Sequence, residues 1–183
     1  MNKKKVFALA GISTLSILGT AANADILIID IGGLSTGGDS IPDVVLTNFI
    51  GANAHVTGMG FDVTLETFGT SWADEAVIAM GNTAAPFVFV TPGANTSAPL
   101  AAPTAYSSGG ITDLIGLTLD FTVGADGMLV TTLFESFDDG IPAPDGMWLA
   151  GSTVTIEYFV PAPGCLALLS LAGLAMPRRR RRV

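Results

Sequence analysis

The stretch Phe61-Asp62-Val63-Thr64-Leu65-Glu66-Thr67 decides the fold class, because large apolar and polar side chains alternate along it without a break. Successive side chains of a β-strand point to opposite faces, so this period of two predicts a strand with one buried and one solvated face. Residues 153–159 repeat the pattern near the end of the chain, with apolar positions at Val154, Ile156 and Tyr158. No segment between these runs sustains the 3.6-residue period of a helix. The body of the chain is therefore expected to be all-β.

Other short apolar runs are separated by Gly, Pro and Asp turns, as expected for neighbouring strands. Residues 25–31 are β-branched and continuous, which predicts a buried first strand. Residues 117–123 and 128–134 flank the turn Gly124-Ala-Asp-Gly127 and predict a hairpin. The stretch 92–110, rich in Ala, Pro, Ser and Thr, is expected to cross between sheets. The remaining expected strands are 44–49, 76–80 and 87–91. This arrangement favours an antiparallel β-sandwich, jelly-roll-like in topology.

Charge is divided sharply along the sequence. All eight basic residues lie in the tails, at Lys3–Lys5 and Arg178–Arg182, and all sixteen acidic residues fall between Asp25 and Glu157. The body up to Val160 therefore contains no Lys or Arg and carries a formal charge of −16. Nucleic acid is excluded as a partner, because basic side chains are needed to neutralise phosphates. Electrostatic attraction to an anionic membrane surface is excluded for the same reason.

The N-terminus has the layout of a secretory signal peptide. Lys3–Lys5 are followed by the apolar run 6–19 and then by Ala22-Asn23-Ala24, a small-x-small cleavage pattern. Cleavage after Ala24 would make Asp25 the first residue of the exported chain. We therefore expect residues 1–24 to be removed and the body to work outside the cytoplasm.

The C-terminus has three parts: Val160-Pro161-Ala162-Pro163-Gly164, the apolar run 165–176, and Pro177 with Arg178–Arg182. As a helix, residues 162–176 would be roughly 22 Å long. The hydrocarbon core of a bilayer is about 30 Å thick, so this helix is short for a durable anchor. The arginines favour the cytoplasmic side of the membrane. We expect transient membrane insertion through this helix; a permanent single-pass anchor is the alternative.

This tail resembles a PEP-CTERM sorting signal, which joins a short proline motif, an apolar helix and a terminal arginine cluster. The resemblance covers about the last 24 residues and none of the body, and Ala162 stands where the family usually has Glu. It implies recognition by an exosortase, a membrane-embedded cysteine transpeptidase-like enzyme, and delivery to the surface or extracellular matrix of a diderm bacterium. The residues that match the motif are Val160, Pro161, Ala162, Pro163, Gly164, Arg178, Arg179, Arg180, Arg181 and Arg182.

The body offers little for catalysis. His55 is the only histidine, expected at the start of a strand, and the only cysteine, Cys165, lies in the tail. A Ser/His/Asp triad needs its base oriented by a third group, and a zinc site needs several His or Cys ligands. Two carboxylates would suffice for a glycosidase, but no strand carries a closely spaced inward pair. The chain is therefore expected not to be an enzyme.

A group of carboxylates near the last strands is the candidate metal site. It comprises Glu135, Asp138, Asp139 and Asp145, set among glycines. Calcium takes six to eight oxygen ligands from such loops, so calcium is the cofactor that this group would bind. A solvated acidic loop is the alternative. Trp148, beside the group, and Trp72, in the turn 69–75, are each either core side chains or platforms for a sugar ring.

Two functions follow from these patterns. The first is an exported, non-catalytic protein of the cell surface or extracellular matrix, sorted through its tail. The alternative is a calcium-dependent, lectin-like module that binds an extracellular polysaccharide. Both divide the chain into a signal peptide (1–24), an acidic sandwich domain (25–159) and a sorting signal (160–183).

Overall fold

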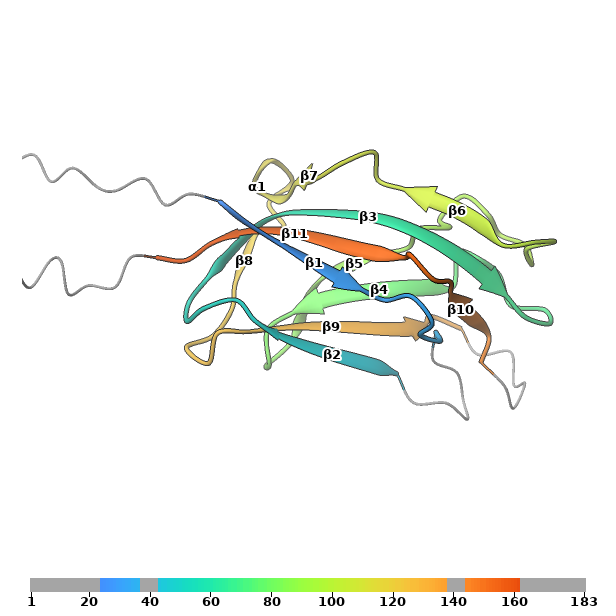
Figure 1. Ribbon diagram of the computed structural model, residues 1–183, viewed down its shortest axis with the longest axis horizontal. Helices are drawn as coiled ribbons and strands as arrows, with labels where there is room; N and C mark the ends of the chain where they lie inside the picture. The colour runs from blue at the N-terminus through green and yellow to red at the C-terminus, as the bar shows by residue number, and fades with distance from the viewer. Residues whose placement is uncertain (1–23, 37–42, 138–143, 162–183) are drawn as a thin grey trace, which may run out of the picture.

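Two antiparallel sheets face each other and enclose one core (Figure 1). The structure is a computed structural model that describes residues 24–36, 43–137 and 144–161. The seven-stranded first sheet contains β1 (Asp25–Asp30), β3 (His55–Thr67), β6 (Thr104–Ser107), β7 (Thr112–Asp113), β8 (Phe121–Thr122), β10 (Gly146–Trp148) and β11 (Thr153–Phe159). The second sheet contains β2 (Val44–Phe49), β4 (Ala76–Gly81), β5 (Pro86–Val90) and β9 (Met128–Glu135). The expected all-β sandwich is confirmed.

Strand β3 is the centre of the first sheet, because it pairs along both of its edges. One edge pairs with β11 and then with β10, and the other pairs in turn with β8, β7 and β6. Its 13 residues span about 40 Å at roughly 3.3 Å per residue. The strand therefore runs the length of the sandwich. The predicted alternation holds, since Val63 and Leu65 are buried and Asp62 is exposed.

Strand β9 is the centre of the second sheet, in which the order is β2-β9-β4-β5. Consecutive strands move between the sheets: β1 lies in the first, β2 in the second, β3 in the first, and β4 and β5 in the second. The chain then returns to the first sheet for β6 to β8, to the second for β9, and to the first for β10 and β11. The stretch after β5 crosses between sheets as predicted, and it contains β6.

The prediction of a buried first strand is wrong. Strand β1 pairs only with β11 and forms an edge of its sheet within the described part of the chain. Ile29 is buried, but Ile26 and Ile28 are 51% and 64% exposed. A continuous apolar run therefore does not require two covered faces, and here one face of the run meets solvent.

The predicted hairpin of 117–123 with 128–134 is also wrong. Asp113 caps a short helix, α1 (Leu114–Leu117), by accepting a hydrogen bond from the backbone N–H of Ile115 at 2.9 Å. The helix ends at Thr118, whose φ of 58° is left-handed. Only Phe121–Thr122 then pair as a strand, and they pair with β3. The turn at 124–127 thus carries the chain from one sheet to the other.

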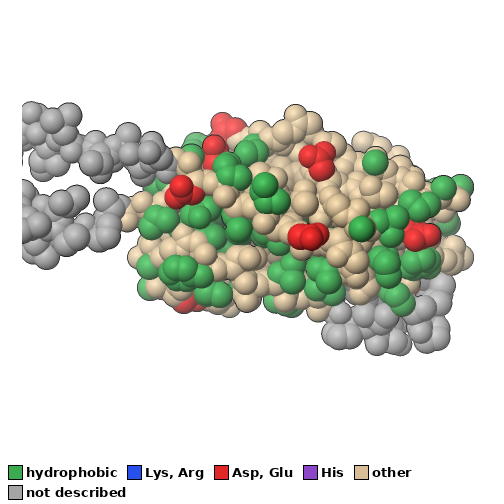
Figure 2. Space-filling view, in the orientation of Figure 1, with side chains coloured by type: hydrophobic (Ala, Val, Ile, Leu, Met, Phe, Trp, Pro, Cys, Tyr) green, Lys and Arg blue, Asp and Glu red, His purple; other side chains and the backbone are tan. Residues whose placement is uncertain are grey.

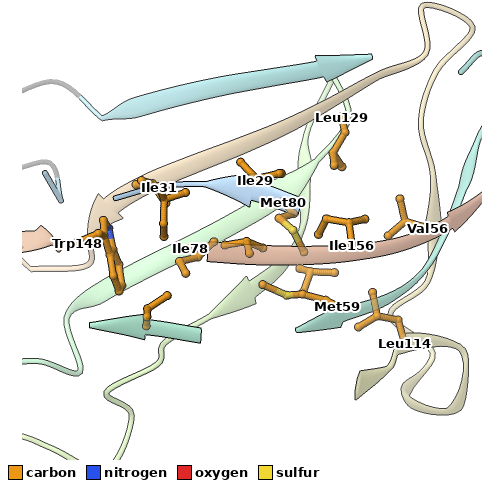
Figure 3. Packing of buried hydrophobic residues seen from close by; sticks show 14 of the residues in the cluster. Ile29, Ile31, Val56, Met59, Ile78, Met80, Leu114, Leu129, Trp148 and Ile156 are labelled. Carbon is orange, nitrogen blue, oxygen red and sulfur yellow. The ribbon is translucent and has the colours of Figure 1, made fainter. Parts of the chain in front are cut away.

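The core lies between the two sheets and is filled mainly by aliphatic side chains. These side chains form a row along the inside of the sandwich. Fully burying one Leu or Ile side chain contributes about 1.5–3 kcal/mol, so the row is the main source of stability. Figure 3 shows Ile156 and Met80 in the middle of the row, with Trp148 near Ile31 and Ile78 towards one end.

Candidate functional site

One end of the sandwich gathers Trp72, Trp148, Glu135 and Asp145. Strand β3 ends there, β4 begins there, and Ala76 of β4 pairs with Glu135 at the end of β9. The loop 68–75 joins β3 to β4, and its Glu75 carbonyl accepts a hydrogen bond from the backbone N–H of Ser136 at 2.8 Å. The loop and the end of β9 are therefore held side by side.

Trp72 lies on the surface of this loop, with 44% of its side chain exposed. Phe137, just beyond β9, is 62% exposed. These two aromatic residues, Thr70 and Glu75 line an open cavity of about 450 Å³. An aromatic face can stack on the C–H face of a sugar ring while a carboxylate and a hydroxyl bond its hydroxyl groups. The prediction of a core position for Trp72 is therefore wrong.

Short hydrogen bonds fix the backbone around Trp72. Its N–H donates to Glu75 Oε2 at 2.8 Å, and the Glu75 N–H donates to the Trp72 carbonyl at 3.1 Å. The Ser97 hydroxyl donates to Asp74 in the same loop. A ligand binding here would therefore order little backbone, which lowers the entropic cost of binding.

Trp148 is a core residue, the first of its two predicted roles. Its side chain is fully buried in β10. Its backbone N–H donates to the Leu34 carbonyl at 2.9 Å, and its carbonyl accepts from Gly33 at 2.7 Å. It therefore packs the end of the core and is not available as a sugar platform.

The structure brings together two of the four carboxylates that the sequence grouped. Glu135 follows Leu133 on the inward face of β9, and both of its carboxylate oxygens are shielded from solvent. Asp145 is only 1% exposed. Asp138 and Asp139 lie outside the described residues. Among the residues that are described, no three His, Cys, Asp or Glu side chains form a metal-binding group.

His55 begins β3, as expected. Its Nε2 lies 2.7 Å from Asp120 Oδ2, the one ion pair within the described ranges. The Phe159 ring packs edge-on against the imidazole, with centroids 5.0 Å apart. Both partners are about one quarter to one third exposed, so the pair contributes at most about 1 kcal/mol. Its evident role is to tie β3 to the segment that leads into β8.

The described chain begins and ends at the end of the sandwich opposite the Trp72 cavity. Asp25 pairs with Tyr158, and Phe159 pairs with His55 at the start of β3. Val160 packs close to Gly51 at this same end. The length of β3 therefore separates the cavity from the points at which both tails leave the body.

Most of the predicted sorting residues lie outside the described residues. These are Ala22, Ala162, Pro163, Gly164 and Arg178–Arg182. Ala24, Val160 and Pro161 are described and lie at the ends of the body. No helix in the part of the chain that the structure describes is long and apolar enough to cross a membrane.

Acidic side chains are spread over the face of the molecule that Figure 2 shows. They lie among hydrophobic and neutral groups, and the described residues contain no Lys or Arg. Such a surface repels a second highly acidic molecule at long range, and salt screens this repulsion beyond about 8 Å at physiological ionic strength. A neutral polymer meets no such barrier.

No protein-family model matches the chain, and no curated protein matches it. Among solved structures, it is similar to the VP2 subviral particle of infectious bursal disease virus, with 9% identity and a TM-score of 0.37. That match covers 84% of this chain and 37% of the viral one. A structure of the Gx strain of the same virus matches with 10% identity and a TM-score of 0.34, covering 91% and 52%. Likeness at this level carries no information about function.

Proposed function

We propose that this chain is an exported, non-catalytic protein of the cell surface or extracellular matrix, sorted through its C-terminal tail by an exosortase-type enzyme. Support comes from the signal-peptide pattern before Asp25 and the tripartite tail after Phe159. The body between these points is a self-contained sandwich core. The strand order, with β1-β11-β3 facing β2-β9-β4-β5, also supports the jelly-roll form of the sandwich.

The observation that carries the proposal is the position of the two ends. Both tails leave the body beside His55, and the aromatic cavity lies about 40 Å away at the far end of β3. A body held at the membrane by its tail could therefore present the cavity outward. After the body is released from the membrane, the cavity end would remain free to contact the extracellular matrix.

Deleting Arg178–Arg182 tests the sorting role. Without the arginines nothing holds the end of the tail at the cytoplasmic face, so the body should be misrouted and should be lost from the surface fraction. Replacing the five arginines with lysines is the matched control, since it keeps the charge. Unchanged surface delivery of the deletion variant would refute the proposal.

A second candidate function is binding of an extracellular polysaccharide, and the exposure of Trp72 beside Phe137 favours it. The Trp72→Ala variant should bind matrix polysaccharide at least about tenfold more weakly, equivalent to 1.4 kcal/mol. Phe89→Ala is the control, because this β5 residue is 59% exposed and does not line the cavity. Equal binding by both variants would exclude the cavity as the polysaccharide site.

Washing the complex with EDTA distinguishes calcium-dependent from calcium-independent binding of the polysaccharide. Loss of bound polysaccharide in EDTA would indicate a calcium-dependent lectin-like module, as the acidic group predicts. Retention would indicate that stacking on Trp72 is sufficient.

A further inference from the structure

Two carboxylates are enclosed at the cavity end of the core. Asp145 precedes β10 and is 1% exposed, and Glu135 points inward from the end of β9. All four of their carboxylate oxygens are shielded from solvent. Burying an ionised carboxylate is costly unless a counter-charge or hydrogen bonds accompany it.

A buried hydroxyl lies beside Gly146, the residue that follows Asp145. Thr36 is fully buried, and its hydroxyl has no hydrogen-bond partner among the described residues. The Thr36 N–H donates to the Gly146 carbonyl at 3.0 Å, which fixes the residue against β10. A buried hydroxyl left without a partner is rare in native proteins and indicates an occupant that the protein atoms do not supply.

Gly146 leaves the space between these groups open. A Cβ at this residue would lie 3.1 Å from Thr36 Oγ1 and 3.5 Å from Glu135 Oε1. The Thr36 hydroxyl and the Glu135 carboxylate therefore border the same small volume. Any larger residue at 146 would fill that volume.

The body has no basic side chain to neutralise this site. No Lys or Arg occurs between Asp25 and Val160, and the only histidine, His55, is paired with Asp120 at the opposite end of β3. A bound cation would therefore bring a positive charge to this site that no Lys or Arg of the body can bring.

We propose that Thr36, Glu135 and Asp145 bind a divalent cation, with calcium as the best match. Carboxylates and a hydroxyl are the oxygen ligands that calcium takes, and backbone carbonyls and water would complete its six to eight contacts. The cation would join the segment after β1, the end of β9 and the start of β10, and so would clamp the two sheets together. The site would supply the calcium of the lectin-like candidate, but the test below measures calcium binding alone and does not depend on polysaccharide binding.

The test is calcium titration of the full-length chain in mild detergent, by calorimetry and by thermal melting in calcium or EDTA at equal ionic strength. The wild type should bind one calcium ion and melt at a higher temperature in calcium. Glu135→Gln and Asp145→Asn should each weaken binding at least about tenfold. The control is Asp25→Asn with Asp62→Asn, which removes two exposed carboxylates and should leave binding unchanged.

Thr36→Val separates a ligand from a merely structural residue. Valine has a similar shape and lacks the hydroxyl, so the melting temperature in EDTA should be unchanged or higher. Calcium affinity should nevertheless fall, and the stabilisation by calcium should shrink. A structural hydroxyl would give the reverse, a loss of stability in EDTA with calcium affinity intact.

Two results would overturn the proposal. One is calcium binding that Glu135→Gln and Asp145→Asn leave as strong as in the control. The other is the absence of any calcium effect on either the binding heat or the melting temperature.

Discussion

Truncating Leu133 should destabilise the sandwich far more than truncating a neighbouring residue on its surface. Leu133 is fully buried, and its strand is paired on both sides, with Val44 of β2 and Ile78 of β4. Strands held on both edges cannot move to fill a cavity, so Leu133→Ala should cost about 3 kcal/mol, within the usual 2–5 kcal/mol. Val45, one position along β2, is 57% exposed, so Val45→Ala should cost only about 0.7 kcal/mol.

Urea unfolding measures the difference. With a slope of about 1.5 kcal/mol per molar urea, Leu133→Ala should lower the midpoint by about 2 M and Val45→Ala by about 0.5 M. Trp148 is buried in the folded state, so its fluorescence reports the transition. Equal shifts for the two variants would refute the central position of β9 between β2 and β4.

Two further predictions test the turn at 124–127, which joins β8 of the first sheet to β9 of the second. Gly127→Ala should lower the free energy of unfolding, measured in urea, by at least about 1 kcal/mol more than Gly33→Ala. Both glycines have a similar positive φ, 70° and 80°, but a Cβ at 127 would come within 2.7 Å of the Gly51 carbonyl carbon, whereas a Cβ at 33 would meet nothing within 4 Å. Equal costs would show that this turn does not pack against Gly51. The Thr83 hydroxyl, 2.7 Å from Asp126 Oδ2, and the Met128 N–H together hold the pKa of Asp126 below its usual range. Titration by NMR should therefore show that the pKa of Asp126 is higher in Thr83→Val than in the wild type. The small stability gained from this contact should be lost as the pH falls through the folded-state pKa of Asp126. An unchanged Asp126 pKa in the variant would contradict the contact.

The strands with alternating patterns were predictable because burial on one face leaves a period of two in the sequence. Residues 153–159 form β11 with the expected bounds, and 61–67 is the second half of β3. Residues 44–49, predicted from a short apolar run, form β2 with the expected bounds. The prediction for residues 25–31 was wrong because a continuous apolar run does not indicate which strands will lie beside it. In the structure, β1 pairs with β11 and with no other described strand, which makes it an edge strand.

The candidate sites were predictable in part. Carboxylates close together in sequence indicated Glu135 and Asp145, since they flank one loop. Thr36 carried no such signal, because it reaches Gly146 through the pairing of distant segments. The exposure of Trp72 could not be inferred either: a lone Trp in a turn gives no period from which to read burial.

The N- and C-terminal sorting signals remain predictions from sequence, and the proposed function rests on them. Mass spectrometry of the protein recovered from the cell surface tests them most directly. The account predicts a chain that begins at Asp25 and yields no peptide from residues 165–183. A surface protein that still contains Lys3–Lys5, or that retains the whole tail through Val183, would contradict it.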